Sequence, residues 1–118
     1  MAASICQRLI NKVWRSYAND LDEAPEAEGI YTIGFKGKYI YVGRSNNIRR
    51  RLKEHKYQNL EVDEFIKEQF SLDNGINLKM KWVQESESAC TEGQYLECRE
   101  KKLGYWPKYN MKRGNACN

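Results

Sequence analysis

The chain has 118 residues, with 20 Lys and Arg against 16 Asp and Glu and a formal net charge of +4. This length is typical of a single domain. No apolar run approaches the roughly 20 residues of a membrane helix, and the first residues lack the basic cluster and apolar run of a signal peptide. We therefore expect an intracellular protein of the nucleus or cytoplasm, neither membrane-bound nor secreted. Disorder is not expected, because 41% of the residues are hydrophobic.

A helix and a hairpin are predicted in the first part of the chain. Apolar residues recur at intervals of three and four over residues 3–18, which predicts an amphipathic helix. An acidic connector follows over residues 20–28. Residues 30–35 and 39–42 are rich in β-branched and aromatic residues and flank a short segment centred on Gly37. This pattern predicts a β-hairpin with glycine at its turn.

Helices dominate the rest of the chain, with one strand between them. Three helices are predicted, at residues 48–57, 61–70 and 88–103. Asn47 is well placed as the N-cap of the first of these, which is basic. Apolar and charged residues alternate strictly over residues 78–82, which predicts a strand with one buried face. Residues 106–110 are expected to be extended.

These elements predict one compact domain of the α/β class, with a layered α+β arrangement. Helices would pack on a small, three-stranded, largely antiparallel sheet, with an extra helix at the N-terminus. Within this domain, residues 1–28 form the N-terminal helix and acidic connector. Residues 29–118 hold the sheet and the remaining helices.

The charges are unevenly distributed along the chain. Residues 20–28 contain five acids and no base, whereas residues 44–56 contain six bases and one acid. A second basic segment, residues 101–113, has five bases and no acid. Two such segments in a short domain indicate a polyanionic partner, although a solvated helix face explains either one alone equally well.

The cysteine pattern gives little support for a metal site built from thiolates. The four cysteines include no C-x-x-C pair, and His55 is the only histidine. Cys90 and Cys98 fall within one predicted helix, eight residues apart, and so are not expected to pair with each other. We expect four free thiols in a reducing compartment.

The hairpin carries a recognisable pair of motifs. Gly29-Ile30-Tyr31 lies on its first strand and Tyr41-Val42-Gly43 on its second, and Arg51 follows eight residues after the last glycine. Together they resemble the GIY-YIG nuclease family, with valine in place of the usual isoleucine. The resemblance covers residues 28–110, more weakly through the middle. It implies a GIY-YIG nuclease-like domain over residues 29–118, preceded by an extension.

The resemblance implies a catalytic role for four side chains. Tyr31 would take a proton from the attacking water, and Tyr41 would hold or tune that water. The two tyrosines stand ten residues apart, an even number, and a short symmetric turn would place them on one face. Arg51 would grip a phosphate oxygen. His55 lies four residues after Arg51, on the same helix face, and would relay the proton or contact the phosphate.

The family also implies a metal ion and contacts to nucleic acid. One glutamate of the last helix would bind a single hydrated Mg²⁺ or Mn²⁺ ion, and Glu92 fits that pattern better than the alternative, Glu97. Asn110 matches the family's closing motif and would orient the site or the chain near it. The residues predicted to contact nucleic acid are Arg44, Arg49, Arg50, Lys53, Lys108 and Asn110.

The sequence therefore predicts a metal-dependent endonuclease that hydrolyses the phosphodiester bonds of DNA with a water activated by tyrosine. Two alternatives fit the same residues. One is a nucleic-acid-binding module on this fold that does not cut. The other is a nuclease subunit directed by a protein partner, and a homodimer is compatible with either activity. No helix-turn-helix or zinc finger is recognisable that would add specificity.

Overall fold

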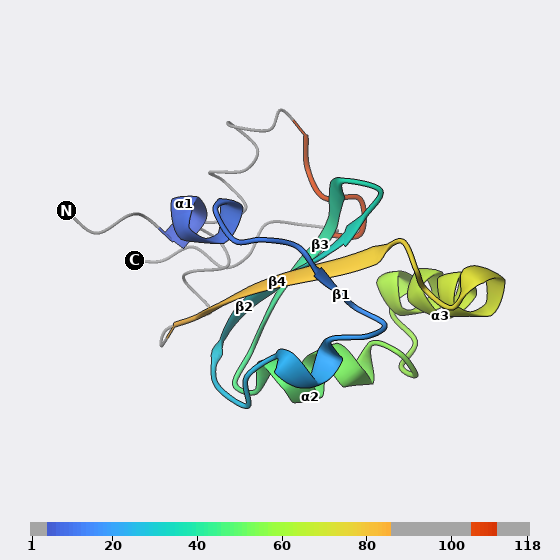
Figure 1. Ribbon diagram of the computed structural model, residues 1–118, viewed down its shortest axis with the longest axis horizontal. Coiled ribbons are helices and arrows are strands. Elements are labelled where there is room, and N and C mark those ends of the chain that lie inside the picture. Colours follow the sequence, from blue (N-terminus) through green and yellow to red (C-terminus); the bar gives the residue numbers. More distant parts are fainter. Residues whose placement is uncertain (1–4, 86–104, 111–118) are drawn as a thin grey trace.

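The computed structural model describes residues 5–85 and 105–110. These residues form an antiparallel sheet with helices on both faces (Figure 1). The elements in chain order are α1 (Ile5–Ile10), β1 (Arg15–Ser16), the short 3₁₀ helix η1 (Leu21–Glu23), β2 (Gly29–Phe35), β3 (Lys38–Ser45), α2 (Ile48–Glu54), α3 (Glu61–Asp73) and β4 (Leu78–Gln84). The strand order is β1-β4-β2-β3. The predicted α+β class is confirmed, with four strands in place of three.

The N-terminal helix is shorter than predicted. It ends at Ile10, and Arg15–Ser16 instead pairs with β4 as the fourth strand. The reason lies in two buried side chains, Leu9 and Tyr17, which pack in different hydrophobic clusters on opposite faces of the sheet. One straight helix would place residues eight apart on the same side. The chain therefore crosses the sheet edge between them.

Two hydrophobic clusters fill the space between the sheet and its helices. The larger one includes Ile33, Leu52 and Met80 and lies between the sheet and the helices α2 and α3. The smaller one lies under α1. The prediction that β4 has only one buried face is wrong, because Lys81 is 4% exposed. Its ammonium donates to the Tyr39 hydroxyl over 2.7 Å and to a carbonyl of α1 over 3.1 Å, which compensates for its burial.

The predicted hairpin with glycine at its turn is present, and the turn between β2 and β3 is two residues long rather than three. Lys36 and Gly37 have φ angles of 50° and 82°, the positive values that such a hairpin turn requires. Next to the turn, Gly34 pairs with Tyr39. Further along, the register shifts so that Ile33 pairs with Tyr41, and the intervening residue of β3 forms a β-bulge.

This bulge determines the face on which Tyr41 lies. Without it, the residue opposite Tyr31 would be Val42, and Tyr41 would lie on the other face of the sheet. With it, Gly43 is opposite Tyr31, and Tyr41 is opposite Ile33 on the same face. The prediction that both tyrosines share a face is therefore correct, but the even spacing was the wrong reason. An added residue, not a symmetric turn, produces the alignment.

The helices α2 and α3 begin where the sequence predicts. The side chain of Asn47 accepts a hydrogen bond from the Arg50 amide over 3.0 Å, which confirms the N-cap. The helix α2 ends at Glu54 rather than residue 57, and α3 continues to Asp73 rather than residue 70. No helix in the two described ranges is long and apolar enough to cross a membrane. The helix predicted at residues 88–103 and Cys90, Cys98 and Cys117 lie outside those ranges.

Candidate active site

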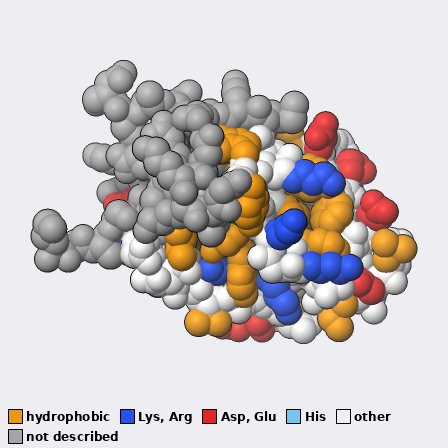
Figure 2. Space-filling view, turned by 90° about the horizontal axis from the view of Figure 1, so that it is seen from above, with side chains coloured by type: hydrophobic (Ala, Val, Ile, Leu, Met, Phe, Trp, Pro, Cys, Tyr) orange, Lys and Arg blue, Asp and Glu red, His pale blue; other side chains and the backbone are white. Residues whose placement is uncertain are grey.

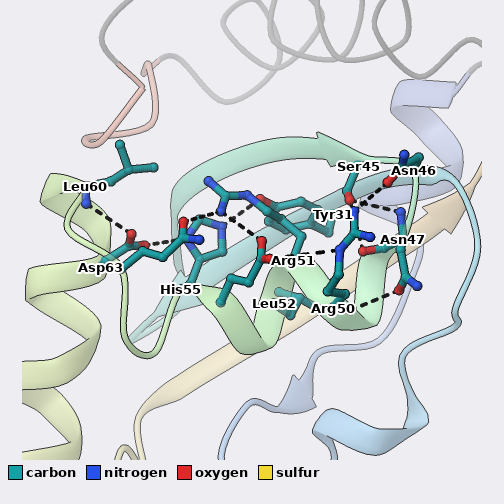
Figure 3. A network of polar contacts seen from close by, with 12 residues as sticks. Tyr31, Ser45, Asn46, Asn47, Arg50, Arg51, Leu52, His55, Leu60 and Asp63 are labelled. Carbon is teal, nitrogen blue, oxygen red and sulfur yellow. Dashed lines mark hydrogen bonds and ion pairs between the residues drawn. The ribbon is translucent and has the colours of Figure 1, made fainter.

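The two motif tyrosines, Tyr31 and Tyr41, lie on the face of the sheet that α2 covers, and Figure 3 shows Tyr31 beside the side chains of α2. The ring centroids of Tyr31 and Tyr41 lie 6.3 Å apart. His55, at the C-cap of α2, places its ring 5.6 Å from that of Tyr31 and 5.3 Å from that of Tyr41. The three rings that the resemblance assigns to catalysis therefore form one cluster built from β2, β3 and the end of α2.

Gly43 leaves the space that the Tyr31 hydroxyl occupies. A Cβ atom at this position would overlap the hydroxyl oxygen of Tyr31 and would lie 2.9 Å from the ring of Tyr41. The hydroxyl therefore rests directly on the backbone of β3. This close approach explains, in physical terms, why the second motif ends in glycine.

A chain of hydrogen bonds runs inward from Tyr31 (Figure 3). The Tyr31 hydroxyl lies 2.6 Å from Nε2 of His55, and Nδ1 of His55 contacts Oδ1 of Asp63 on α3. The other carboxylate oxygen of Asp63 accepts a hydrogen bond from the Leu60 amide over 3.0 Å. All three side chains of the Tyr31–His55–Asp63 chain are fully buried. The structure thus brings together Tyr31 and His55 and adds a third member.

Sequence reasoning missed Asp63. An acid in the first turn of a helix is ordinarily a capping residue, and Asp63 does cap α3 through Leu60. Nothing in the local sequence indicates that its second oxygen faces a histidine on another helix. Only the packing of α3 beside the end of α2 reveals this contact.

The histidine is held neutral near pH 7. Burial lowers the pKa of His55 below its usual range, and the contact with Asp63 offsets this only in part. A neutral imidazole has one nitrogen that donates and one that accepts. His55 can therefore accept a proton, which the imidazolium form could not do.

This lowered pKa predicts that acid destabilises the fold. Between the folded pKa and the unfolded value of about 6.5, the unfolded chain binds more protons, so stability falls as the pH falls through that window. His55 can change the free energy of unfolding by at most about 1.4 kcal/mol per pH unit. Urea unfolding measured from pH 8 to pH 5 should show the free energy of unfolding beginning to fall near pH 6.5. No other histidine can produce it, and a flat profile above pH 5 in the wild type would contradict it.

Arg51 lies beside the tyrosines on the outer side of the cluster. Its guanidinium donates to Gln58 over 2.6 Å and to Glu54 over 3.3 Å. Partial burial acts to lower the pKa of Arg51, but attraction to Tyr31 and the hydrogen bond to Glu54 outweigh it and raise the pKa. Arg51 is therefore a permanent cation next to the tyrosine hydroxyls, where the resemblance expects a phosphate-binding arginine.

Four of the five cations predicted to contact nucleic acid are exposed: Arg44, Arg50, Lys53 and Lys108. Arg44 lies on β3, and Lys108 lies with its ammonium 5.3 Å from the ring centroid of Tyr109. Arg50 is exposed on α2 and donates to Asn46 over 2.7 Å. Figure 2 shows Lys and Arg side chains gathered near the middle of one face, with Asp and Glu mainly along its rim.

Lys53 and the fifth cation, Arg49, face the acidic connector. Lys53 forms an ion pair with Asp22 at 3.0 Å, and Arg49 forms one with Glu26 at 3.5 Å. Arg49 also donates to the Ala24 carbonyl over 2.7 Å. The connector thus partly neutralises the basic helix α2 on this side, away from the motif tyrosines.

Asn110 binds the backbone of the second motif. Its side chain accepts from the Val42 amide over 2.8 Å and donates to the Val42 carbonyl over 2.9 Å. The preceding residue, Tyr109, donates from its amide to the Ile40 carbonyl over 2.9 Å, beside the bulge. Asn110 therefore holds β3 next to the motif tyrosines, and both of its side-chain polar atoms are occupied in doing so.

Both candidate metal ligands, Glu92 and Glu97, lie outside the described residues. Within residues 5–85 and 105–110 there is no group of three or more His, Cys, Asp or Glu that could hold a metal ion. The two acids next to the ring cluster, Glu54 and Asp63, are bonded to Arg51 and His55. A metal ion at this site would therefore need a carboxylate ligand from outside the described residues, with water completing its coordination.

Known proteins resemble this chain in sequence pattern and in fold. The family model of the GIY-YIG catalytic domain matches residues 27–110. A solved structure of the GIY-YIG N-terminal endonuclease domain of UvrC from Thermotoga maritima, bound to magnesium as its catalytic divalent cation, has a TM-score of 0.54 at 21% identity. The match covers 80% of this chain and 96% of that chain. A point mutant of that domain gives 0.55 at 23% identity, covering 81% and 96%.

No curated protein sequence matches this chain significantly. The solved structures support the fold, and the family model covers well over half of the chain and includes both motifs, Arg51 and Asn110. The chain belongs to the GIY-YIG family.

Proposed function

We propose that this protein is a metal-dependent endonuclease that hydrolyses phosphodiester bonds in DNA. The observation that carries the proposal is the 2.6 Å contact between the Tyr31 hydroxyl and Nε2 of a neutral, buried His55, with the cation of Arg51 at its side. A phenol has a pKa of about 10 and is a poor base alone near pH 7. A histidine that accepts the phenol proton lets Tyr31 take one from water at the same time.

The reaction follows from these positions. A water oxygen attacks phosphorus while its proton passes to the Tyr31 oxygen, and the Tyr31 proton passes to Nε2 of His55. The bond from phosphorus to the leaving sugar oxygen breaks, and that oxygen takes a proton from solvent. Arg51 stabilises the charge that develops on the phosphoryl oxygens. When the product leaves, Tyr31 releases to solvent the proton that it took from water, and His55 returns its own proton to the Tyr31 oxygen.

Substrate entry requires a side chain to move. Tyr31 is fully buried, whereas Tyr41 and Arg51 are partly exposed. The guanidinium of Arg51 is held by neutral Gln58 and by Glu54. A phosphate offers Arg51 two charged oxygens in fork geometry, so we propose that it displaces Gln58 and uncovers the Tyr31 hydroxyl.

We propose Glu92 as the metal ligand, with Glu97 as the alternative, and Mg²⁺ or Mn²⁺ as the ion. When bound, the ion supplies further positive charge for the phosphoryl and leaving oxygens. The magnesium bound in the UvrC domain supports the proposal of a divalent cation. We propose DNA as the partner because exposed Arg44, Arg50 and Lys108 suit a phosphate backbone.

The assignment of the metal ligand gives the test. The purified protein is incubated with supercoiled plasmid in Mg²⁺, Mn²⁺ or chelator, beside Glu92→Gln and Glu97→Gln. We expect nicking by the wild type only with metal, a loss of at least about hundredfold in Glu92→Gln, and nicking retained in Glu97→Gln. Glu64→Gln, an exposed charge change on α3, is the control.

Three outcomes would change the proposal. The reverse pattern would assign the metal to Glu97. Nicking that survives chelator would contradict metal dependence. Binding without nicking under every condition would instead favour a module that binds DNA without cutting it.

A further inference from the structure

We propose that Asp63 is a positioning residue for catalysis, which fixes His55 in the tautomer that can accept the Tyr31 proton. This inference rests on the proposed nuclease function and extends it to a residue on α3 that contacts no substrate. Figure 3 shows the three side chains in one line, with Asp63 at the end farther from Tyr31.

Both ends of the histidine are held. His55 follows α2 and its amide donates to the Arg51 carbonyl over 3.2 Å, which fixes the backbone. Its ring is fully buried, with Nδ1 on Asp63 and Nε2 on Tyr31. No solvent reaches either ring nitrogen, so the two protein partners decide where the ring proton resides.

Asp63 is itself fixed in place. One carboxylate oxygen accepts from the Leu60 amide at the start of α3, and the other faces His55. The residue is fully buried, so no water competes for either oxygen. The contact that caps α3 therefore orients the other carboxylate oxygen of Asp63 toward His55, eight residues earlier in the chain.

The chemistry of these partners selects one tautomer. An ionised carboxylate only accepts hydrogen bonds, so Nδ1 of His55 must carry the ring proton. Nε2 then has a free lone pair, and the Tyr31 hydroxyl must donate to it. In the proposed reaction, the Tyr31 oxygen accepts the water proton as its own proton moves to Nε2. In the opposite tautomer, Nε2 would donate to Tyr31 and could not receive its proton.

The same contact also serves the charged state formed in the reaction. When Tyr31 passes its proton to Nε2, His55 becomes an imidazolium with both nitrogens donating. The Asp63 carboxylate is already in contact with that cation, in a buried site where the attraction is strong. Asp63 therefore favours the proton transfer in two ways. It selects the accepting tautomer of His55 before the transfer, and it pairs with the imidazolium after the transfer.

Asp63→Asn tests this role without removing the cap. The amide oxygen can still accept from Leu60, which turns the amide nitrogen toward Nδ1 of His55. That nitrogen donates, so the histidine proton should move to Nε2. We expect the DNA cleavage rate to fall about 10²- to 10⁴-fold, the range for loss of general-base catalysis, with DNA affinity unchanged.

The tautomer can be read directly, because His55 is the only histidine in the chain. In ¹⁵N-labelled wild-type protein at pH 7.5, NMR shifts of the two ring nitrogens should identify Nδ1 as protonated and Nε2 as the acceptor. The spectrum of Asp63→Asn should show the opposite pattern. Asp63→Glu, which keeps the carboxylate, should keep the wild-type tautomer and regain much of the cleavage rate. Glu64→Gln, the same charge change on the exposed side of α3, should alter neither measurement.

These measurements separate the inference from the proposed function. A wild-type ring that is protonated on Nε2 alone, or an imidazolium at pH 7.5, would overturn the role of Asp63 whether or not DNA is cut. So would a variant with the switched tautomer that cuts DNA at the wild-type rate. If Asp63→Asn does not fold, the wild-type spectrum and Asp63→Glu still decide. If the wild type cuts no DNA, the proposed function fails, while the spectrum still reports which ring nitrogen of His55 carries the proton.

Discussion

Tyr31→Phe should bind DNA like the wild type and cut it at least about 10²- to 10⁴-fold more slowly. The substitution removes one oxygen atom, the one that contacts Nε2 of His55 and that we propose takes the water proton. The ring should keep its place on the backbone of Gly43, because phenylalanine is smaller than tyrosine. The measurement is the single-turnover cleavage rate at saturating protein, with binding measured separately in Ca²⁺.

The chain provides a matched control for this substitution. Tyr57 is 67% exposed, so Tyr57→Phe removes the same atom from a surface position and should cut at the wild-type rate. Loss of the Tyr31 hydroxyl also leaves a buried imidazole nitrogen without its partner, at a cost of about 1–3 kcal/mol. The assay temperature must therefore lie well below the melting temperature of the variant. Cleavage by Tyr31→Phe within a few-fold of wild type would contradict the role of Tyr31 as the base.

Arg51→Ala should reduce cleavage by about 10²- to 10³-fold, the usual cost of removing one donor aimed at developing negative charge. It removes the cation that lies beside Tyr31 and that we propose binds the phosphate. Arg51→Lys should recover little, because an ammonium lacks the planar fork that binds two oxygens together. The rate at saturating protein measures this loss apart from any loss of affinity.

The neighbouring position on α2 provides the control. Arg50 is exposed and is bonded to Asn46, so Arg50→Ala should weaken DNA binding and its salt dependence while leaving the saturated rate near wild type. Equal losses in the two alanine variants would indicate that Arg51 acts only as one more surface charge. That result would contradict its place in the reaction.

Local signals in the sequence predicted much of the fold. The hairpin turn at Gly37, the cap at Asn47 and the buried positions of α2 each depend on a few neighbouring residues, and all are present. The β-bulge depends on how two strands pair, and nothing in the spacing of Tyr31 and Tyr41 reveals it. The even spacing of Tyr31 and Tyr41 does not by itself place them on one face when the turn has two residues. The prediction was correct because the bulge adds one residue to β3.

The errors arise from contacts between distant segments. The apolar residues of residues 3–18 do recur at helical intervals, but they do not form one helix. Leu9 and Tyr17 are instead buried on opposite faces of the sheet. Lys81 looks like a solvent-facing residue in an alternating strand, and only the covering helix α1 shows why it is buried. Tertiary packing outweighed local pattern in both cases.

The candidate site divides in the same way. The resemblance to the GIY-YIG family pointed to Tyr31, Tyr41, Arg51 and His55, and the structure brings these side chains together. Asp63 was not identified, because its local position explains it fully as a helix cap. Its second contact belongs to the packing of α3 against the end of α2, which no periodicity in the sequence encodes.

The central claim is that this chain cuts DNA and does not only bind it. The most direct test measures binding and cutting on one end-labelled branched DNA, using the wild-type protein in Mg²⁺, in Ca²⁺ and in chelator. We predict that Mg²⁺ alone gives cleavage, and that Ca²⁺ gives binding of similar strength without cleavage. Stable binding with no cleavage in Mg²⁺ or Mn²⁺, at protein concentrations that saturate the DNA, would contradict the account.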